Sequence, residues 1–137
     1  MPSTTDHRAQ AVTNEQAHAA VQRSPVDLFD WEITTLFYTA VHEIRAFLSR
    51  KDAVHRGGRL HYGDFDKLLR RYGEGTVADN FDQLKDWSQQ ARYSCKGQTW
   101  CQNKLSVAEQ ALRRIQARLA TLHVALDAQG VPPDGPP

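Results

Sequence analysis

The chain has 137 residues, of which 40% are hydrophobic and 24% charged, and its formal net charge is +1. This length favours one domain with its own core, and the near-neutral charge excludes any argument for nucleic-acid binding from overall charge. The sequence has no apolar run near the roughly 20 residues of a membrane span and no secretory signal at its start, so we expect a cytoplasmic protein without membrane contact.

Apolar residues recur at helical spacing along most of the chain. The first predicted helix is rich in Ala and Gln and ends at Ser24-Pro25, and Asp30 is a good N-cap for the second. The last helix has the clearest leucine stripe and ends before Gly130. The predicted helices cover residues 6–23, 30–51, 64–72, 77–95 and, after KGQTW, 101–129.

No segment shows the alternation of polar and β-branched residues that is typical of strands. We therefore predict an all-α fold, an antiparallel bundle of four to five helices joined by short loops. Residues 1–128 form the single domain in this interpretation. Residues 129–137 contain VPPDGPP, which cannot continue a helix, and we predict a Pro/Gly-rich disordered tail there.

The second predicted helix has an unusual set of side chains opposite its apolar face. At 100° per residue, four of them cluster on that side: Trp31, Tyr38, His42 and Arg45. A surface helix would have Lys and Glu at these positions. We therefore predict that this face is an inner wall of the bundle, filled by Trp31 and Tyr38. His42 and Arg45 would reach a polar pocket shared with Arg92.

Polar side chains of the second helix, the loop after it and the fourth helix have the chemistry of a site for a phosphate-bearing ligand. Arginine binds phosphate through two parallel hydrogen bonds, imidazole transfers protons near neutral pH, and hydroxyl groups donate to oxygen atoms. No carboxylate accompanies them, which disfavours Mg²⁺-dependent chemistry, and we expect no metal or cofactor. The candidate residues are Tyr38 and His42 in the second helix, His55, Arg56, Arg59 and His61 in the following loop, and Ser88, Arg92 and Tyr93 in the fourth helix.

Two further features of the sequence each allow two interpretations. Residues 50–72 contain seven Lys or Arg and three Asp, an excess that fits either a phosphate-binding surface or an ordinary solvated face. Cys95 and Cys101 lie six residues apart. A zinc site would need two further ligands, from among His42, His55 and His61, whereas two half-buried thiols at a helix junction need none.

Four short motifs follow one another along the chain: DW at 30–31, FYTAVH at 37–42, a loop with His and Arg at 55–61, and SQQARY at 88–93. In this order they resemble a bacterial branch of the HEPN superfamily (higher eukaryotes and prokaryotes nucleotide-binding domain). The resemblance extends over about residues 6–126. The loop of that branch tends to read His-x-x-Ser-His-x-x-Arg, whereas this sequence has HRGGRLHYG, so either His61 or Arg59 takes the second role.

The resemblance implies a bundle of antiparallel helices, a homodimer, and RNA or a nucleotide as partner. Active members of the superfamily look like metal-independent endoribonucleases of toxin–antitoxin and antiviral systems, and other members are non-catalytic modules. The implied reaction is attack of a ribose 2′-OH on the adjacent phosphate, in which a histidine moves protons and an arginine stabilises the phosphorane. A protein partner, an antitoxin or an effector, would accompany such a domain.

The signature of the active members is an Arg followed by a His after four to six residues on a late helix. The stretch RLATLH, from Arg118 to His123, matches this spacing, with Leu119 in place of the usual polar residue. Residues five apart on a helix project about 140° from one another. Arg118 and His123 would therefore flank the leucine stripe and meet a partner's pair across a dimer seam.

Three hypotheses follow from the sequence. The first is an RNA-cleaving domain that uses either His42 with Arg92 or Arg118 with His123. The second is a non-catalytic module that binds RNA, a nucleotide or a protein. The third is a helical dimerisation domain in which the polar cluster is a buried network that holds the helices in register.

Overall fold

The computed structural model describes residues 3–55, 60–94 and 96–135. These residues contain five α-helices, two short 3₁₀-helices and no strand, so the predicted all-α bundle with antiparallel packing is confirmed. The helices are α1 (Thr4–Gln22), α2 (Phe29–Lys51), η1 (Ala53–His55), η2 (Tyr62–Asp64), α3 (Phe65–Arg71), α4 (Gly75–Tyr93) and α5 (Gly97–Ala128).

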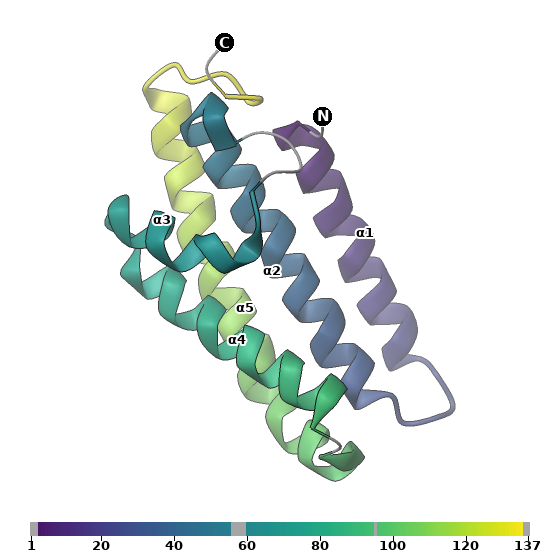
Figure 1. The fold of residues 1–137 in the computed structure, drawn as a ribbon. Helices are drawn as coiled ribbons and strands as arrows, with labels where there is room; N and C mark the ends of the chain where they lie inside the picture. The colour runs from purple at the N-terminus through teal and green to yellow at the C-terminus, as the bar shows by residue number, and fades with distance from the viewer. Residues whose placement is uncertain (1–2, 56–59, 95, 136–137) are drawn as a thin grey trace.

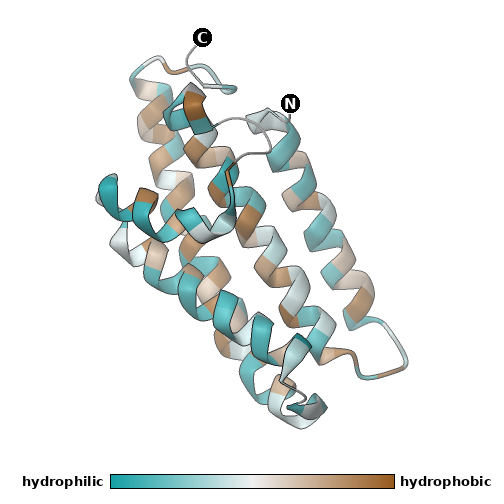
Figure 2. Cartoon of the chain, viewed as in Figure 1, coloured by the Kyte–Doolittle hydropathy of each residue, from teal (hydrophilic) through white to brown (hydrophobic). Residues whose placement is uncertain are grey.

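Helix α2 is central in the bundle (Figure 1). It packs against α1, α4 and α5, while α4 also packs against α5 and the short α3 packs on α4. Apolar segments alternate with polar ones along the helices (Figure 2). Each fully buried aromatic or aliphatic side chain stabilises the fold by about 1.5–3 kcal/mol. The largest fully buried apolar side chains are Phe37, Phe47, Phe65, Phe81, Ile33, Ile44, Leu48, Leu69, Leu84, Ile115 and Leu119. No helix in the described ranges combines the length and the apolarity that a membrane crossing requires.

Buried polar contacts join α1 to α2. Helix α1 begins with a capping box, in which the Ser3 hydroxyl accepts from the Asp6 N–H and the Asp6 carboxylate accepts from the Ser3 N–H. The hydroxyl oxygens of Thr4 and Ser49 lie 2.7 Å apart in a buried position. The buried residues of α1 are Thr4, His7 and Ala11, so this helix buries little apolar surface. Its position on α2 therefore depends on these polar contacts.

The beginning of α2 differs from the sequence prediction. Asp30 is not the N-cap: the helix begins at Phe29, and the N-cap residue Leu28 makes no side-chain cap hydrogen bond. Instead the Gln98 side chain of α5 accepts from the Phe29 N–H (2.8 Å) and donates to the Asp30 carboxylate (3.0 Å). A residue distant in sequence thus satisfies the helix terminus, and rules for local caps cannot identify it.

The turn between α3 and α4 positions one acidic side chain. Gly73 has a φ of 79°, a left-handed conformation that glycine adopts without strain, and the Glu74 N–H donates to the Leu69 carbonyl at 2.8 Å. This ending of α3 leaves Glu74 only 7% exposed and paired with Arg118 of α5.

The sequence predicts a disordered tail from residue 129, and the structure describes this segment as far as residue 135. The described part folds back onto the bundle. The Val131 and Pro132 carbonyls accept from Arg50 at 2.8 and 3.2 Å, and the Asp134 carboxylate accepts from the Thr5 hydroxyl at 2.7 Å. Proline lacks an N–H but keeps its carbonyl acceptor, so a Pro-rich segment can end a helix and still dock.

Candidate functional site

The second face of α2 is open to solvent at two positions that we expected to be interior. Trp31 is 54% exposed and Tyr38 is 38% exposed. The prediction that these side chains fill an inner wall is therefore wrong. At 100° per residue the two side chains lie within about 20° of each other on α2, opposite its apolar arc. Helices α1 and α4 both pack against α2 (Figure 1) and hardly touch each other within the described chain.

Arg92 of α4 is held among aromatic rings beside Tyr38. Its Nη1 donates to the Tyr38 hydroxyl and its Nε to the Ser88 carbonyl, both at 3.3 Å. The guanidinium carbon lies 5.6 Å from the ring centre of Tyr38, 5.7 Å from that of Phe37 and 5.0 Å from that of Tyr93. Tyr93 itself is 74% exposed. We call Trp31, Tyr38, Arg92 and Tyr93 the aromatic face.

His42 lies one helical turn from Tyr38 and contacts α1. Its Nδ1 is 3.1 Å from Nδ1 of His7. Burial, followed by repulsion from His7 and Arg45, lowers the pKa of His42 to about 4, and burial also lowers the pKa of His7. Both rings are therefore neutral at neutral pH, so one Nδ1 donates to the other.

The predicted polar cluster divides into separate contacts. The hydrogen bond of His42 goes to His7, and that of Arg92 goes to Tyr38. Ser88 is fully buried, and its hydroxyl has no partner among the described residues; only its backbone carbonyl reaches Arg92. Arg45 donates to the Leu60 carbonyl at 3.2 Å. One continuous buried network of these residues, the basis of the third hypothesis, is not present in the described chain.

The histidines of the loop after α2 make local contacts. Nε2 of His55 lies 2.8 Å from the Tyr72 hydroxyl, and burial lowers the His55 pKa. Nδ1 of His61 accepts from the Gly63 N–H at 2.9 Å, so this side chain caps η2. Arg56 and Arg59, which we predicted as ligand-binding residues, lie outside the described residues.

Arg118 and His123 take part in two different interactions on α5. Arg118 pairs with Glu74 through two hydrogen bonds of 2.8 and 2.9 Å. His123 is 6% exposed, and Nη1 of Arg50 lies 3.1 Å from both its Nδ1 and its carbonyl oxygen. Burial, followed by repulsion from Arg8 and Arg50, lowers the pKa of His123 to about 4. The structure does not bring the Arg118 and His123 side chains together.

Sequence reasoning missed His7 and Arg50. His7 could have been found from the register of the hairpin, because residues about equally far from the turn at Pro25 face each other, and His7 and His42 are such a pair. Arg50 is 1% exposed and joins α2 to α5 and to the segment after it; Nη2 also contacts the Asp127 carboxylate. The sequence could have indicated this burial, because Arg50 lies at the border of the apolar arc of α2.

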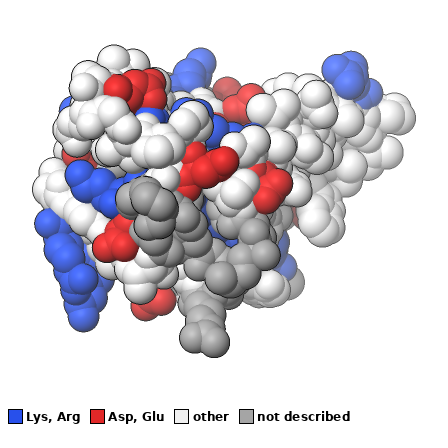
Figure 3. All heavy atoms as spheres, turned by 90° about the horizontal axis from the view of Figure 1, so that it is seen from above, with Lys and Arg blue, Asp and Glu red and all other residues white. Residues whose placement is uncertain are grey.

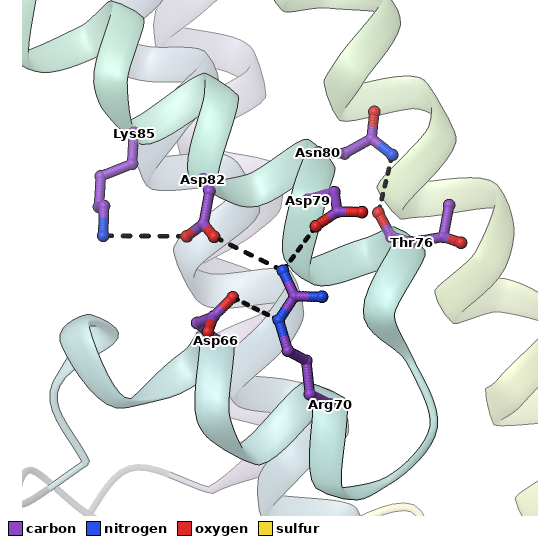
Figure 4. A network of polar contacts seen from close by, with 7 residues as sticks. All are labelled: Asp66, Arg70, Thr76, Asp79, Asn80, Asp82 and Lys85. Atoms are coloured by element: carbon purple, nitrogen blue, oxygen red, sulfur yellow. Dashed lines mark hydrogen bonds and ion pairs between the residues drawn. The ribbon is translucent and has the colours of Figure 1, made fainter.

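Two of the five described basic side chains of residues 50–72, Arg50 and Arg70, are paired with carboxylates. Figure 4 shows the Arg70 guanidinium between three carboxylates, with Asp66 and Asp79 at 2.9 and 2.5 Å and Asp82 at 4.0 Å. Arg50 is buried against Asp127. In the end view of Figure 3, Lys and Arg are interspersed with Asp and Glu over the described residues. Charge therefore favours the solvated-face interpretation for the described part of this segment.

Neither metal-binding side chains nor comparisons with known proteins indicate a function. Across the ranges that the structure describes, no three His, Cys, Asp or Glu side chains are grouped as a metal ion would require. Cys101 is fully buried, which raises the pKa of its thiol, and Cys95 lies outside the described residues. No family model, curated protein or solved structure matches the chain significantly. A functional conclusion therefore depends on the geometry of the aromatic face.

Proposed function

We propose that the chain is a HEPN-like domain that binds RNA or a nucleotide on the aromatic face. The observation that carries this proposal is the position of Arg92 between the rings of Tyr38 and Tyr93, both of which are exposed. Exposed aromatic rings stack on unpaired bases, and a guanidinium held in place binds phosphate. Arg92 uses two N–H groups within the protein, and a guanidinium has five.

The motifs that resemble the superfamily support the same surface. Trp31 belongs to DW, Tyr38 to FYTAVH, and both Arg92 and Tyr93 to SQQARY. The first two motifs lie in α2, and SQQARY lies in α4, where Arg92 contacts Tyr38 across the two packed helices. Toxin–antitoxin or antiviral defence is the setting that the resemblance suggests, with a homodimer and an antitoxin or effector as partners. Analytical ultracentrifugation tests the dimer. A molecular mass of twice the 15.5 kDa chain would agree with it, and the mass of one chain would count against it.

The binding test is a titration of fluorescein-labelled single-stranded RNA, followed by anisotropy, with ATP as a competitor. Arg92→Ala and Tyr93→Ala should each weaken binding about tenfold, because stacking contributes roughly 1–3 kcal/mol per base. Tyr93→Phe keeps the ring and should bind like the wild type. Arg114→Ala removes an exposed arginine of α5 and is the charge-matched control. Equal effects of Arg92→Ala and Arg114→Ala would contradict the proposed surface.

A second candidate function, metal-independent RNA cleavage, is favoured by the position of His42 one turn from Tyr38. The neutral ring can accept the proton of a ribose 2′-OH as that oxygen forms a bond to the adjacent phosphorus. The bond from phosphorus to the 5′ oxygen then breaks, and this oxygen takes up a proton. Arg92 would stabilise the charge of the phosphorane. The products are a 2′,3′-cyclic phosphate and a 5′-OH end.

Cleavage is tested by incubating the protein with a mixed tRNA and mRNA pool in excess EDTA. If His42 is the base, His42→Ala abolishes cleavage while His123→Ala, at the buried histidine of α5, leaves it unchanged. Loss in His123→Ala alone would assign the reaction to α5. RNA binding without cleavage by any form would identify the domain as a non-catalytic module.

A further inference from the structure

We propose that a cavity between α1, α2 and α5 binds a small organic cation, an amine or guanidinium on an aliphatic stem. Its volume of about 350 Å³ lies in the usual range of ligand sites. The proposal does not depend on the aromatic face, which lies on the opposite side of α1. The lining residues are Glu15, His18 and Gln22 of α1, Leu36 and Thr39 of α2, and Glu109, Leu112 and Arg113 of α5.

The floor of the cavity fits an aliphatic stem. Leu36 and Leu112 are buried and apolar, 4% and 5% exposed. The Thr39 hydroxyl beside them donates to the Thr35 carbonyl at 2.9 Å, which leaves its oxygen as an acceptor. An apolar floor with a few placed polar groups is typical of sites for small molecules.

The walls of the cavity have an excess of negative charge. Glu15 and Glu109 line it on opposite helices, against the single cation Arg113 among the lining residues. Burial lowers the pKa of His18, so this side chain is neutral at neutral pH. Glu109 has no ion-pair partner among the described residues, whereas the Gln116 amide donates to Glu15. An unpaired carboxylate beside an apolar floor favours a cationic ligand.

Two further carboxylates extend the negative charge along α2. Glu32 is 5% exposed and lies 3.4 Å from Nε2 of His18, and Glu43 is half-buried. Burial raises the pKa of both, and nearby Glu109 raises that of Glu32 further, as Glu15 does for Glu43. Glu32 therefore lies near Glu109, and Glu43 lies near Glu15. A cation bound in the cavity would relieve the repulsion within each pair.

The test is isothermal titration calorimetry at low salt with agmatine and spermidine as probes and uncharged 1,4-butanediol as the neutral analogue. Glu109→Gln should weaken binding about tenfold, and Arg113→Gln should strengthen it severalfold, because the first removes an attraction and the second a repulsion. Asp86→Asn makes the same charge change at an exposed position on α4 and should have no effect. An end-blocked peptide with one arginine tests whether the cation comes from a protein instead.

Each result of this experiment decides the proposal. Saturable binding of either amine with the opposite responses of Glu109→Gln and Arg113→Gln would support it. Absence of binding at millimolar amine, equal weakening by Glu109→Gln and Asp86→Asn, or weakening by Arg113→Gln would overturn it. Binding of the peptide alone would also overturn it, in favour of a protein partner.

Discussion

At the scale of single residues, burial keeps two histidines neutral and makes the fold sensitive to acid. The pKa values of His42 and His123 are both about 4 in the folded protein, below the ordinary 6.5. Between these values the unfolded chain binds more protons than the folded one, so stability is complete above pH 6.5 and falls as the pH drops towards 4. For the nearly fully buried His123 the full shift corresponds to on the order of 3 kcal/mol.

We predict that His123→Gln loses less stability than the wild type between pH 7 and pH 4. The difference should be on the order of 2–3 kcal/mol, since glutamine does not titrate. Urea denaturation at both pH values measures it. His61→Gln, at the exposed residue that precedes η2, is the matched control and should show the same acid loss as the wild type. An equal acid loss in both variants would show that His123 is not the acid-sensitive group.

The contacts of Arg118 predict a structural effect rather than an effect on RNA. Its side chain is about half exposed, at 48%, and pairs with buried Glu74. Arg118→Met should lower the free energy of unfolding by roughly 1 kcal/mol and leave RNA affinity unchanged, whereas Arg92→Met should weaken RNA binding. Anisotropy titrations of both variants make the comparison. If Arg118→Met weakened binding as much as Arg92→Met, the RNA site would be on α5.

At the scale of secondary-structure elements, one buried side chain joins α2, α5 and the segment after α5. Arg50 donates to the Pro132 and Val131 carbonyls and to His123, and contacts the Asp127 carboxylate. A buried, fully bonded arginine leaves several acceptors unpaired when it is removed.

We predict that Arg50→Met lowers the free energy of unfolding by roughly 3–5 kcal/mol, and that Asp127→Asn lowers it by about 1 kcal/mol. Asp127 is 65% exposed, so solvent screens its charge. Urea denaturation at pH 7 gives both values. A loss below about 1 kcal/mol in Arg50→Met would mean that the segment after α5 does not depend on this side chain.

The sequence predicts the helices well because each has its own periodicity, and it predicts contacts between helices poorly. The leucine stripe of α5 and the apolar arc of α2 are local patterns, and both helices are present. The exposure of Trp31 depends on where α1 and α4 lie, and the pairing of Arg118 depends on the turn at Gly73. The sequence predicts a pocket that His42 and Arg45 share with Arg92, but Arg92 contacts Tyr38 and the partner of His42 is His7 of α1.

At the scale of the whole molecule, the near-neutral charge limits how RNA can bind. The net charge is +1, and on the face that Figure 3 shows, Lys and Arg are mixed with Asp and Glu. Binding on the aromatic face should therefore depend on stacking with few phosphate contacts. We predict a slope of log K against log salt of about −1 to −2, measured by anisotropy between low and physiological salt. A slope steeper than about −4 would indicate an extended basic surface instead.

The most direct test of the account is to identify which residues touch RNA. Single-stranded RNA containing 4-thiouridine would be crosslinked to the protein with ultraviolet light, and the modified peptides would be identified by mass spectrometry. We predict crosslinks at Trp31, Tyr38 or Tyr93, reduced in Arg92→Ala and retained in Arg114→Ala. Crosslinks confined to α5 around Arg113 and Arg118 would contradict the aromatic face as the binding site. The absence of any crosslink to the folded protein would contradict it as well.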